Sequence, residues 1–404
     1  MNTASATVTT KSAAPALLPS LATTVGAYFA ARLCLTFLFF QSNPQQGAIL
    51  GLALNMMLLL VAIFNSFGPT RSTQLSPWRV ASFRWAAAFL GFSFCSLLWT
   101  QAVSLPAALA YWCGMTADVA IVLLLLRSGS LVEIATSMMQ GYVVGACFIA
   151  CVMWLSPIMQ DLRPGNDEFF SPNLIGFTCA FGVFMAEYLM VHSKSWRYPA
   201  LFLAISLLRS LSKTTIIAFL LSQAFLLIFS TTIRRRSKVL IVTAAGLMLV
   251  AFSGLIAAYY QVYTNSGDQA ETLTGRIGIW AFILDRALER PWFGHGFDSV
   301  WKVIPPFGID QFEAWHAHNE LLQQFYAYGV VGIVLLAGLY WSFCTEVRRV
   351  ARPEHRTLLL SLVAFIAIRG LGDTERFDLS FPLWSIALLG LMLPALKRPV
   401  EGAP

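Results

Sequence analysis

Two of the chain's five histidines stand at the point where a polar stretch gives way to a long apolar one, within Trp315–Gln323. A neutral imidazole can accept a proton from a hydroxyl group at neutral pH. We therefore predict that His318 is a general base, with His316 as a neighbour in a supporting role. The simpler alternative is that His318 only caps the helix that follows it.

Asn319 and Gln323 are four residues apart, so they share one face of that helix and are predicted to orient His318 or to bind an acceptor. A metal is not expected. On a helix, two histidines at this spacing point to different faces, and neither a His-Glu-x-x-His motif nor a cysteine cluster accompanies them.

Three cations are candidates for binding a diphosphate. Arg276 follows Gly275 at the predicted start of a helix, where a guanidinium and unpaired N–H groups suit phosphate oxygens. Arg209 and Lys213 flank a short turn and are four residues apart. The alternative for all three is an ordinary side chain reaching the membrane surface.

Two acids lie close together near the end of the chain, Asp373 and Glu375. We predict that they support His318 or bind an acceptor. Their spacing would also suit a divalent cation. The first predicted outer loop, 41–46, carries no acid that could complete such a site, so a metal is disfavoured. No metal or other cofactor is therefore expected.

The composition shows what must position these residues. The chain is 57% hydrophobic and 12% charged, with a mean hydropathy of +0.67, whereas soluble domains are about 25% charged. Apolar runs of about 20 residues recur throughout, which predicts an all-α polytopic membrane protein. The net charge of +7 resides in short loops, as in membrane proteins generally, so it does not indicate nucleic acid. No glycine-rich nucleotide-binding motif is present.

The apolar runs predict twelve spans, at 16–40, 47–66, 79–100, 104–126, 131–156, 173–193, 197–209, 213–232, 239–262, 319–345, 357–371 and 381–396. Residues 1–15 are predicted to be a disordered cytoplasmic tail, 16–262 to hold spans one to nine, 263–318 to form one long loop, and 319–404 to hold the last three spans and a short tail.

Charge predicts the orientation of these spans. With both termini in the cytoplasm, seventeen lysines and arginines fall on the inner side and nine on the outer side. This arrangement puts the loop 263–318 and the turn 209–213 on the same outer face. Within the loop, Ile277–Glu289 is predicted to be an amphipathic helix, and Pro291–Gly296 to end it.

Arg32 lies inside the first span, where an ionisable group is costly. Asp118 and Glu187, also inside spans, are its candidate partners.

Several of these segments together resemble the O-antigen ligase/polymerase superfamily. Leu273–Arg276, Trp280 and Pro291–Phe297 are similar to its outer-loop pattern, and His318–Gln323 running into Tyr328–Gly332 resembles its histidine motif. Ser171–Asn173 and Ser212–Thr214 resemble two further motifs. Lys213 departs from the arginine frequent in the family, so either Arg209 or Lys213 could fill the cationic role.

The resemblance implies a membrane glycosyltransferase of the GT-C type at the periplasmic face of the bacterial inner membrane. Such enzymes move a glycan from undecaprenyl diphosphate to an acceptor. Ligases use lipid A–core, polymerases another lipid-linked repeat, and protein O-oligosaccharyltransferases Ser or Thr. The chain most resembles a ligase, with inverting, metal-independent chemistry, membrane lipids around it and no nucleotide or nucleic acid partner. A lipid or polysaccharide transporter and a structural or signalling membrane protein are the alternatives from other classes.

Overall fold

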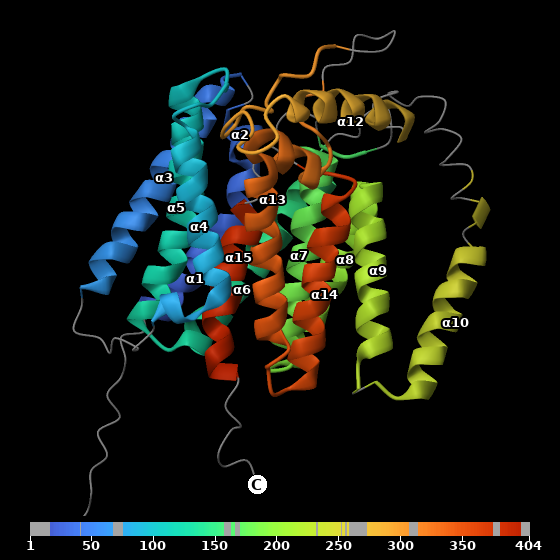
Figure 1. The fold of residues 1–404 in the computed structure, drawn as a ribbon. Helices are drawn as coiled ribbons and strands as arrows, with labels where there is room; N and C mark the ends of the chain where they lie inside the picture. The colour runs from blue at the N-terminus through green and yellow to red at the C-terminus, as the bar shows by residue number, and fades with distance from the viewer. Residues whose placement is uncertain are drawn as a thin grey trace, which may run out of the picture.

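A computed structural model describes residues 17–40, 42–67, 76–156, 163–165, 170–231, 233–251, 253–254, 257, 273–306, 314–374 and 380–396. The long elements of this part of the chain are all helices (Figure 1), as the composition predicts. Most stand side by side in a bundle, and α12 (Leu273–Leu288) lies across one end of it, which we call the site end.

The upright helices follow the chain in order. They are α1 (Leu17–Ala31), α2 (Leu35–Phe39), α3 (Pro44–Ser66), α4 (Ala81–Ser96), α5 (Leu105–Ser128), α6 (Leu131–Leu155), α7 (Pro172–Met190), α8 (Arg197–Ser210), α9 (Lys213–Phe229), α10 (Arg235–Ala251), α13 (Glu320–Val347), α14 (Pro353–Gly370) and α15 (Ser380–Leu396). Short 3-10 turns form at Arg32–Cys34, Pro77–Arg79 and Lys194–Trp196.

The helices agree with the predicted spans in position. Six of those in the described residues are long and apolar enough to cross a membrane: Gln45–Ser66, Leu105–Ser128, Leu131–Leu155, Pro172–Met190, Glu320–Val347 and Pro353–Gly372. Lys213–Phe229 and Pro382–Leu396 are apolar but shorter. The chain is thus a multi-pass membrane protein, while the total of twelve crossings and the orientation remain predictions.

The first predicted span is not one continuous α-helix. Between α1 and α2 the chain tightens into a 3-10 turn that begins at Arg32. The Arg32 guanidinium contacts both carboxylate oxygens of Asp118, at 2.7 and 2.6 Å, and Asn55 donates to the same carboxylate at 2.9 Å. Asp118 rather than Glu187 is therefore the partner of Arg32, and the three side chains join the 3-10 turn after α1 to α3 and α5.

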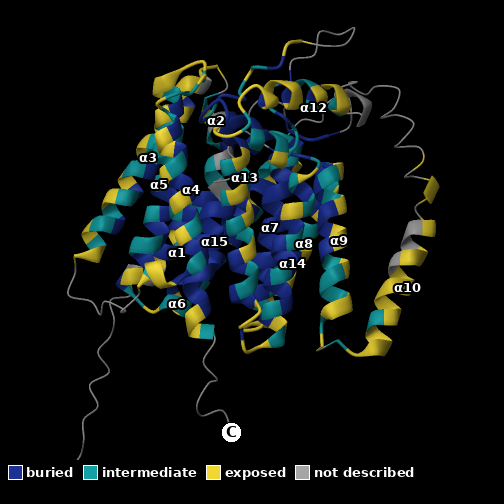
Figure 2. Cartoon of the chain, in the orientation of Figure 1, coloured by how far each residue is buried: buried dark blue, intermediate teal, exposed yellow. Residues whose placement is uncertain are grey.

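The amphipathic helix of the long loop is present as α12. It buries Ile279, Ile283 and Ala287, which are spaced four residues apart, while Ile277 and Leu284 are exposed. The helix begins at Leu273, earlier than predicted, so Arg276 lies in its first turn. Figure 2 shows this exposed side of α12 above a largely buried bundle interior.

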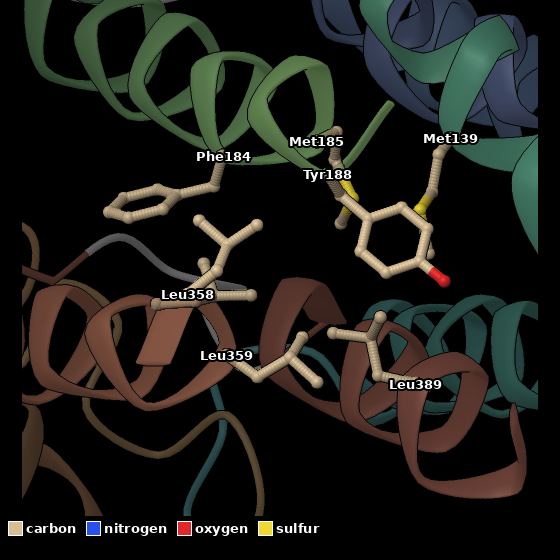
Figure 3. Close-up of a pocket in the computed structure, with 8 residues that line it drawn as sticks. Met139, Phe184, Met185, Tyr188, Leu358, Leu359 and Leu389 are labelled. Atoms are coloured by element: carbon tan, nitrogen blue, oxygen red, sulfur yellow. The ribbon is translucent and has the colours of Figure 1, made fainter. Parts of the chain in front are cut away.

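An apolar pocket lies at the end of α7 opposite Pro172, far from the site end (Figure 3). It is lined by Met139, Phe184, Met185, Tyr188, Leu358, Leu359, Leu362 and Leu389. The Tyr188 hydroxyl, the one polar side-chain group in this lining, donates to the Met392 sulfur at 3.7 Å. This pocket therefore offers no group for catalysis.

Candidate active site

The turn that carries His316 and His318 is held by two hydrogen bonds to the backbone of Ala317. The Trp280 indole N–H of α12 donates to the Ala317 carbonyl at 3.1 Å, and the Gln323 side-chain oxygen of α13 accepts from the Ala317 N–H at 3.3 Å. His318 has φ of 48°, a left-handed conformation that a non-glycine residue adopts only when its surroundings enforce it. Trp280 and Gln323 supply those surroundings.

His318 lies against the buried carboxylate of Asp373. Its Nδ1 is 3.3 Å from Asp373 Oδ1, while Asp373 Oδ2 is 3.3 Å from the Arg369 guanidinium. Because a carboxylate only accepts hydrogen bonds, Nδ1 must carry the proton, which leaves Nε2 to accept another. Asp373 thus sets the tautomer that a general base requires.

The charge of Asp373 is fixed by its neighbours. Complete burial would disfavour ionisation, but Arg369 and the hydrogen bond with His318 outweigh it and hold the Asp373 pKa well below its usual range. Arg369 is itself only 3% exposed and lies over the Phe177 ring of α7, 4.3 Å from the centroid. Asp373 is therefore an anion at neutral pH, paired with a cation on one side and an imidazole on the other.

Arg276, in the first turn of α12, contacts the loop 371–374 that carries Asp373. Its Nη1 donates to the Gly372 carbonyl and to the Thr214 hydroxyl, the latter at 3.3 Å. Its Nε is buried and has no hydrogen-bond partner among the described residues. Since Gly372 precedes Asp373, the predicted phosphate cation and the predicted base contact adjacent residues of one loop.

Two further contacts lock this loop to the start of α13. Asn319 caps the helix by accepting from the Leu322 N–H at 3.0 Å and also donates to the Leu371 carbonyl at 2.9 Å. The Thr374 hydroxyl donates to the buried Glu320 carboxylate at 2.8 Å. Asn319 thus joins the start of α13 to the loop that carries Asp373, while its predicted role toward His318 or an acceptor stays a prediction.

His316 packs directly on His318, with ring centroids 4.1 Å apart. The turn is not helical, so the argument that this spacing separates the two rings is wrong. One ligand atom each from His316, His318 and Asp373 lie within 4.8 Å of one another, a geometry that would suit a metal. Arg369 already contacts the Asp373 carboxylate. Burial lowers the pKa of His316 well below its usual range, and the nearby His318 lowers this pKa further, so His316 is neutral.

The remaining predicted residues are less closely involved. Lys213 begins α9, is exposed, and precedes the Thr214 that contacts Arg276. Arg209 ends α8 and lies over the Trp154 ring of α6, with 5.9 Å between its guanidinium carbon and the centroid. Glu375 lies outside the described residues.

Sequence reasoning missed Arg369 and Thr214 as parts of the site. Arg369 was counted only as an outer cation, although an arginine in an apolar span, four residues before an aspartate, is a signal for a buried ion pair. Thr214 carried no such signal, because its role comes from the packing of α9 beside the loop.

Part of the chain is similar to proteins of a known family. Residues 198–337 match the sequence model of a family described as O-antigen ligase. This stretch contains Arg209, Lys213, Arg276, His316 and His318. The chain is also 24% identical over 328 residues to the exopolysaccharide production protein ExoQ of Rhizobium meliloti (strain 1021), covering 73% of each chain.

Proposed function

We propose that this chain, which belongs to the O-antigen ligase/polymerase superfamily, transfers a glycan from undecaprenyl diphosphate to an acceptor hydroxyl at the outer face of the membrane. The observation that carries the proposal is the meeting of His318, Asp373 and Arg276 at the loop 371–374. A base and a partly unpaired cation at one loop suit a reaction that removes a proton at one atom and releases a diphosphate at another.

The proposed reaction is a single displacement. His318 Nε2 takes the proton of the acceptor hydroxyl, and the hydroxyl oxygen forms a bond to the anomeric carbon of the donor glycan. The bond from that carbon to the phosphate oxygen breaks, and undecaprenyl diphosphate leaves with the electron pair. Because attack and departure occur on opposite faces, the anomeric configuration is inverted.

Asp373 and the arginines have separate roles in this step. Asp373 stabilises the imidazolium that forms as His318 accepts the proton, because the carboxylate is ionised and 3.3 Å from Nδ1. Arg276, together with Lys213 or Arg209, balances the charge that grows on the departing diphosphate. The step needs neither a nucleotide nor a metal, since the donor is already activated by its diphosphate.

The acceptor is the finer part of the proposal. The first candidate is lipid A–core, which would make the protein an O-antigen ligase, in line with the description of the matched family. The second is another lipid-linked glycan, which would make it a polymerase, and the exopolysaccharide role in the name of its relative favours this alternative. A protein acceptor has no support of its own, and a transporter would not require a base oriented by a buried carboxylate.

Reconstitution tests the function and separates the two acceptors. Purified protein in detergent is given undecaprenyl-diphosphate-linked glycan with a chelator present, alone or with lipid A–core. A ligase joins one glycan to lipid A–core, while a polymerase lengthens the donor glycan without it. Failure of the wild-type chain to release undecaprenyl diphosphate with either acceptor would contradict the proposal, and retained anomeric configuration would contradict the single displacement.

A further inference from the structure

The helix α13 is broken at one residue near the site end. Gly329 has φ of 62° and ψ of −156°, so the helical hydrogen bonds from Val330 and Val331 to the preceding turn are lost. These two N–H groups donate instead to the carbonyls of Pro291 and Trp292, at 2.8 and 3.3 Å. A segment from the long loop therefore replaces the missing turn for the second half of α13.

The same segment also completes the first half of the helix. The N–H groups of His295 and Gly296 donate to the carbonyls that the break leaves free, on Tyr326 and Ala327, at 2.9 and 2.8 Å. We call these four backbone bonds between Pro291–Gly296 and α13 the splice. An unsatisfied backbone group within a membrane protein costs several kcal/mol, so the break and the segment depend on each other.

Close approach of the two backbones makes the splice rigid. A Cβ atom on Gly329 would come within 2.4 Å of the Trp292 carbonyl carbon, and one on Gly294 would come within 2.4 Å of the Ala327 carbonyl carbon. Both glycines have positive φ, at 62° and 63°. No side chain separates the loop from the helix at these points, so a change in one displaces the other.

His295 ties the splice to two more elements. Its ring is buried and stacks on Tyr326, with centroids 4.4 Å apart. Nε2 donates to the Arg286 carbonyl in the last turn of α12 at 2.9 Å, and this carbonyl also accepts from the Glu289 N–H at 3.2 Å. Nδ1 lies 2.9 Å from the side-chain oxygen Oε1 of Gln101, in the loop between α4 and α5.

We propose that His295 is a positioning residue that fixes α12, which carries Arg276, relative to the outer half of α13, which begins beside His318. This inference rests on the proposed function for its catalytic consequence, but its geometric content does not. Arg276 lies on α12 and His318 in the turn just before α13. His295 bonds to the Arg286 carbonyl of α12 and stacks on Tyr326 of α13. His295 itself takes no part in proton transfer or phosphate binding.

The lengths of the helices set the expected effect. Ten residues separate Arg276 from Arg286, about 15 Å along α12 at about 1.5 Å per residue. A tilt of about 5° at the splice end would move Arg276 by roughly 1.3 Å, and a displacement of about 1 Å can cost on the order of 100-fold in rate. We therefore expect His295→Ala to lower kcat by roughly 30- to 100-fold, with donor KM within about threefold of wild type.

The test measures geometry and rate separately. Nitroxide labels are placed on Leu284→Cys and Leu321→Cys, two exposed positions on α12 and α13, in a chain whose exposed Cys95 and Cys151 are replaced by alanine. The distance distribution between the labels is expected to be narrow in this parent and to broaden or shift with His295→Ala. His295→Gln, which keeps a donor able to reach the Arg286 carbonyl, should restore part of both the distance distribution and kcat.

His192→Ala is the matched control, because His192 is an exposed histidine at the opposite end of the bundle. A folded His295→Ala chain with an unchanged label distance would overturn the proposal, whatever its activity. So would a loss of kcat no larger than that of His192→Ala, or a His295→Gln chain no better than His295→Ala. Absence of transfer by the wild-type chain would instead contradict the proposed function and leave the distance measurement to decide the role of His295.

Discussion

Replacing Asp373 by asparagine removes one charge from the site while leaving its shape nearly unchanged. Two unit charges 3.3 Å apart attract by about 5 kcal/mol at an effective dielectric of about 20, which is an upper limit for the pair that Asp373 forms with protonated His318. A hydrogen bond to a charged group contributes about 1.5–3 kcal/mol net. Because the proposed step adds a proton to His318, losing this interaction should lower kcat about 10- to 150-fold.

The assay is release of undecaprenyl diphosphate from the lipid-linked donor, measured with saturating donor and acceptor. Asp373→Asn is made both alone and together with His318→Ala. If Asp373 acts through His318, Asp373→Asn should lower kcat little in a chain that already carries His318→Ala. The effects of the two substitutions on kcat should therefore be far from additive.

Loss of stability needs its own control, because Asp373 also neutralises buried Arg369. Glu346→Gln serves here, since Glu346 is another buried carboxylate whose contacts are all at the opposite end of the bundle. The reasoning would be refuted if Asp373→Asn reduced kcat equally with and without His318, or if Glu346→Gln reduced it as much.

Three further outcomes follow from contacts in the structure. Glu346 accepts from the Ala81 N–H and the Ser82 hydroxyl, both at 2.6 Å, so Glu346→Gln should destabilise the protein by about 1–3 kcal/mol without a change in kcat; thermal unfolding in detergent measures this, and an unchanged midpoint would contradict it. Trp280→Phe removes the hydrogen bond to the Ala317 carbonyl but keeps an aromatic ring, so kcat should fall by about 2- to 10-fold, and a loss above about 100-fold would mean that Trp280 does more than hold the turn. Chelation by EDTA should leave the rate unchanged, because Arg369 and His318 already occupy the Asp373 carboxylate; loss of activity that zinc restores would instead assign a metal to the two histidines and Asp373.

Much of the helical layout could be predicted because hydrophobic length is a strong signal in a membrane protein. The 3-10 turn after α1 was not predicted, because the apolar run of the first predicted span continues through it. The start of α12 at Leu273, rather than at Ile277, was also missed.

The candidate site was predictable where one residue type carried the signal, as with His318 and Arg276. Asp373 was placed among the supporting residues, but its contact with His318 depends on how the 371–374 loop folds back on α13. The closeness of His316 to His318 was predicted wrongly because a helix was assumed where the chain forms a turn with positive φ at His318. Arg369 was overlooked because it was counted only as an outer cation, although Asp373 stands four residues after it in the sequence.

The central claim is that His318 is the base in glycan transfer, and the rate of His318→Ala tests it most directly. Single-turnover transfer from undecaprenyl-diphosphate-linked glycan is compared with wild type at equal donor occupancy, with EDTA present and His192→Ala as the control. A general base contributes roughly 100- to 10,000-fold, so we predict a fall within that range and no change in donor binding. Transfer by a folded His318→Ala chain within a few-fold of wild type would contradict the account.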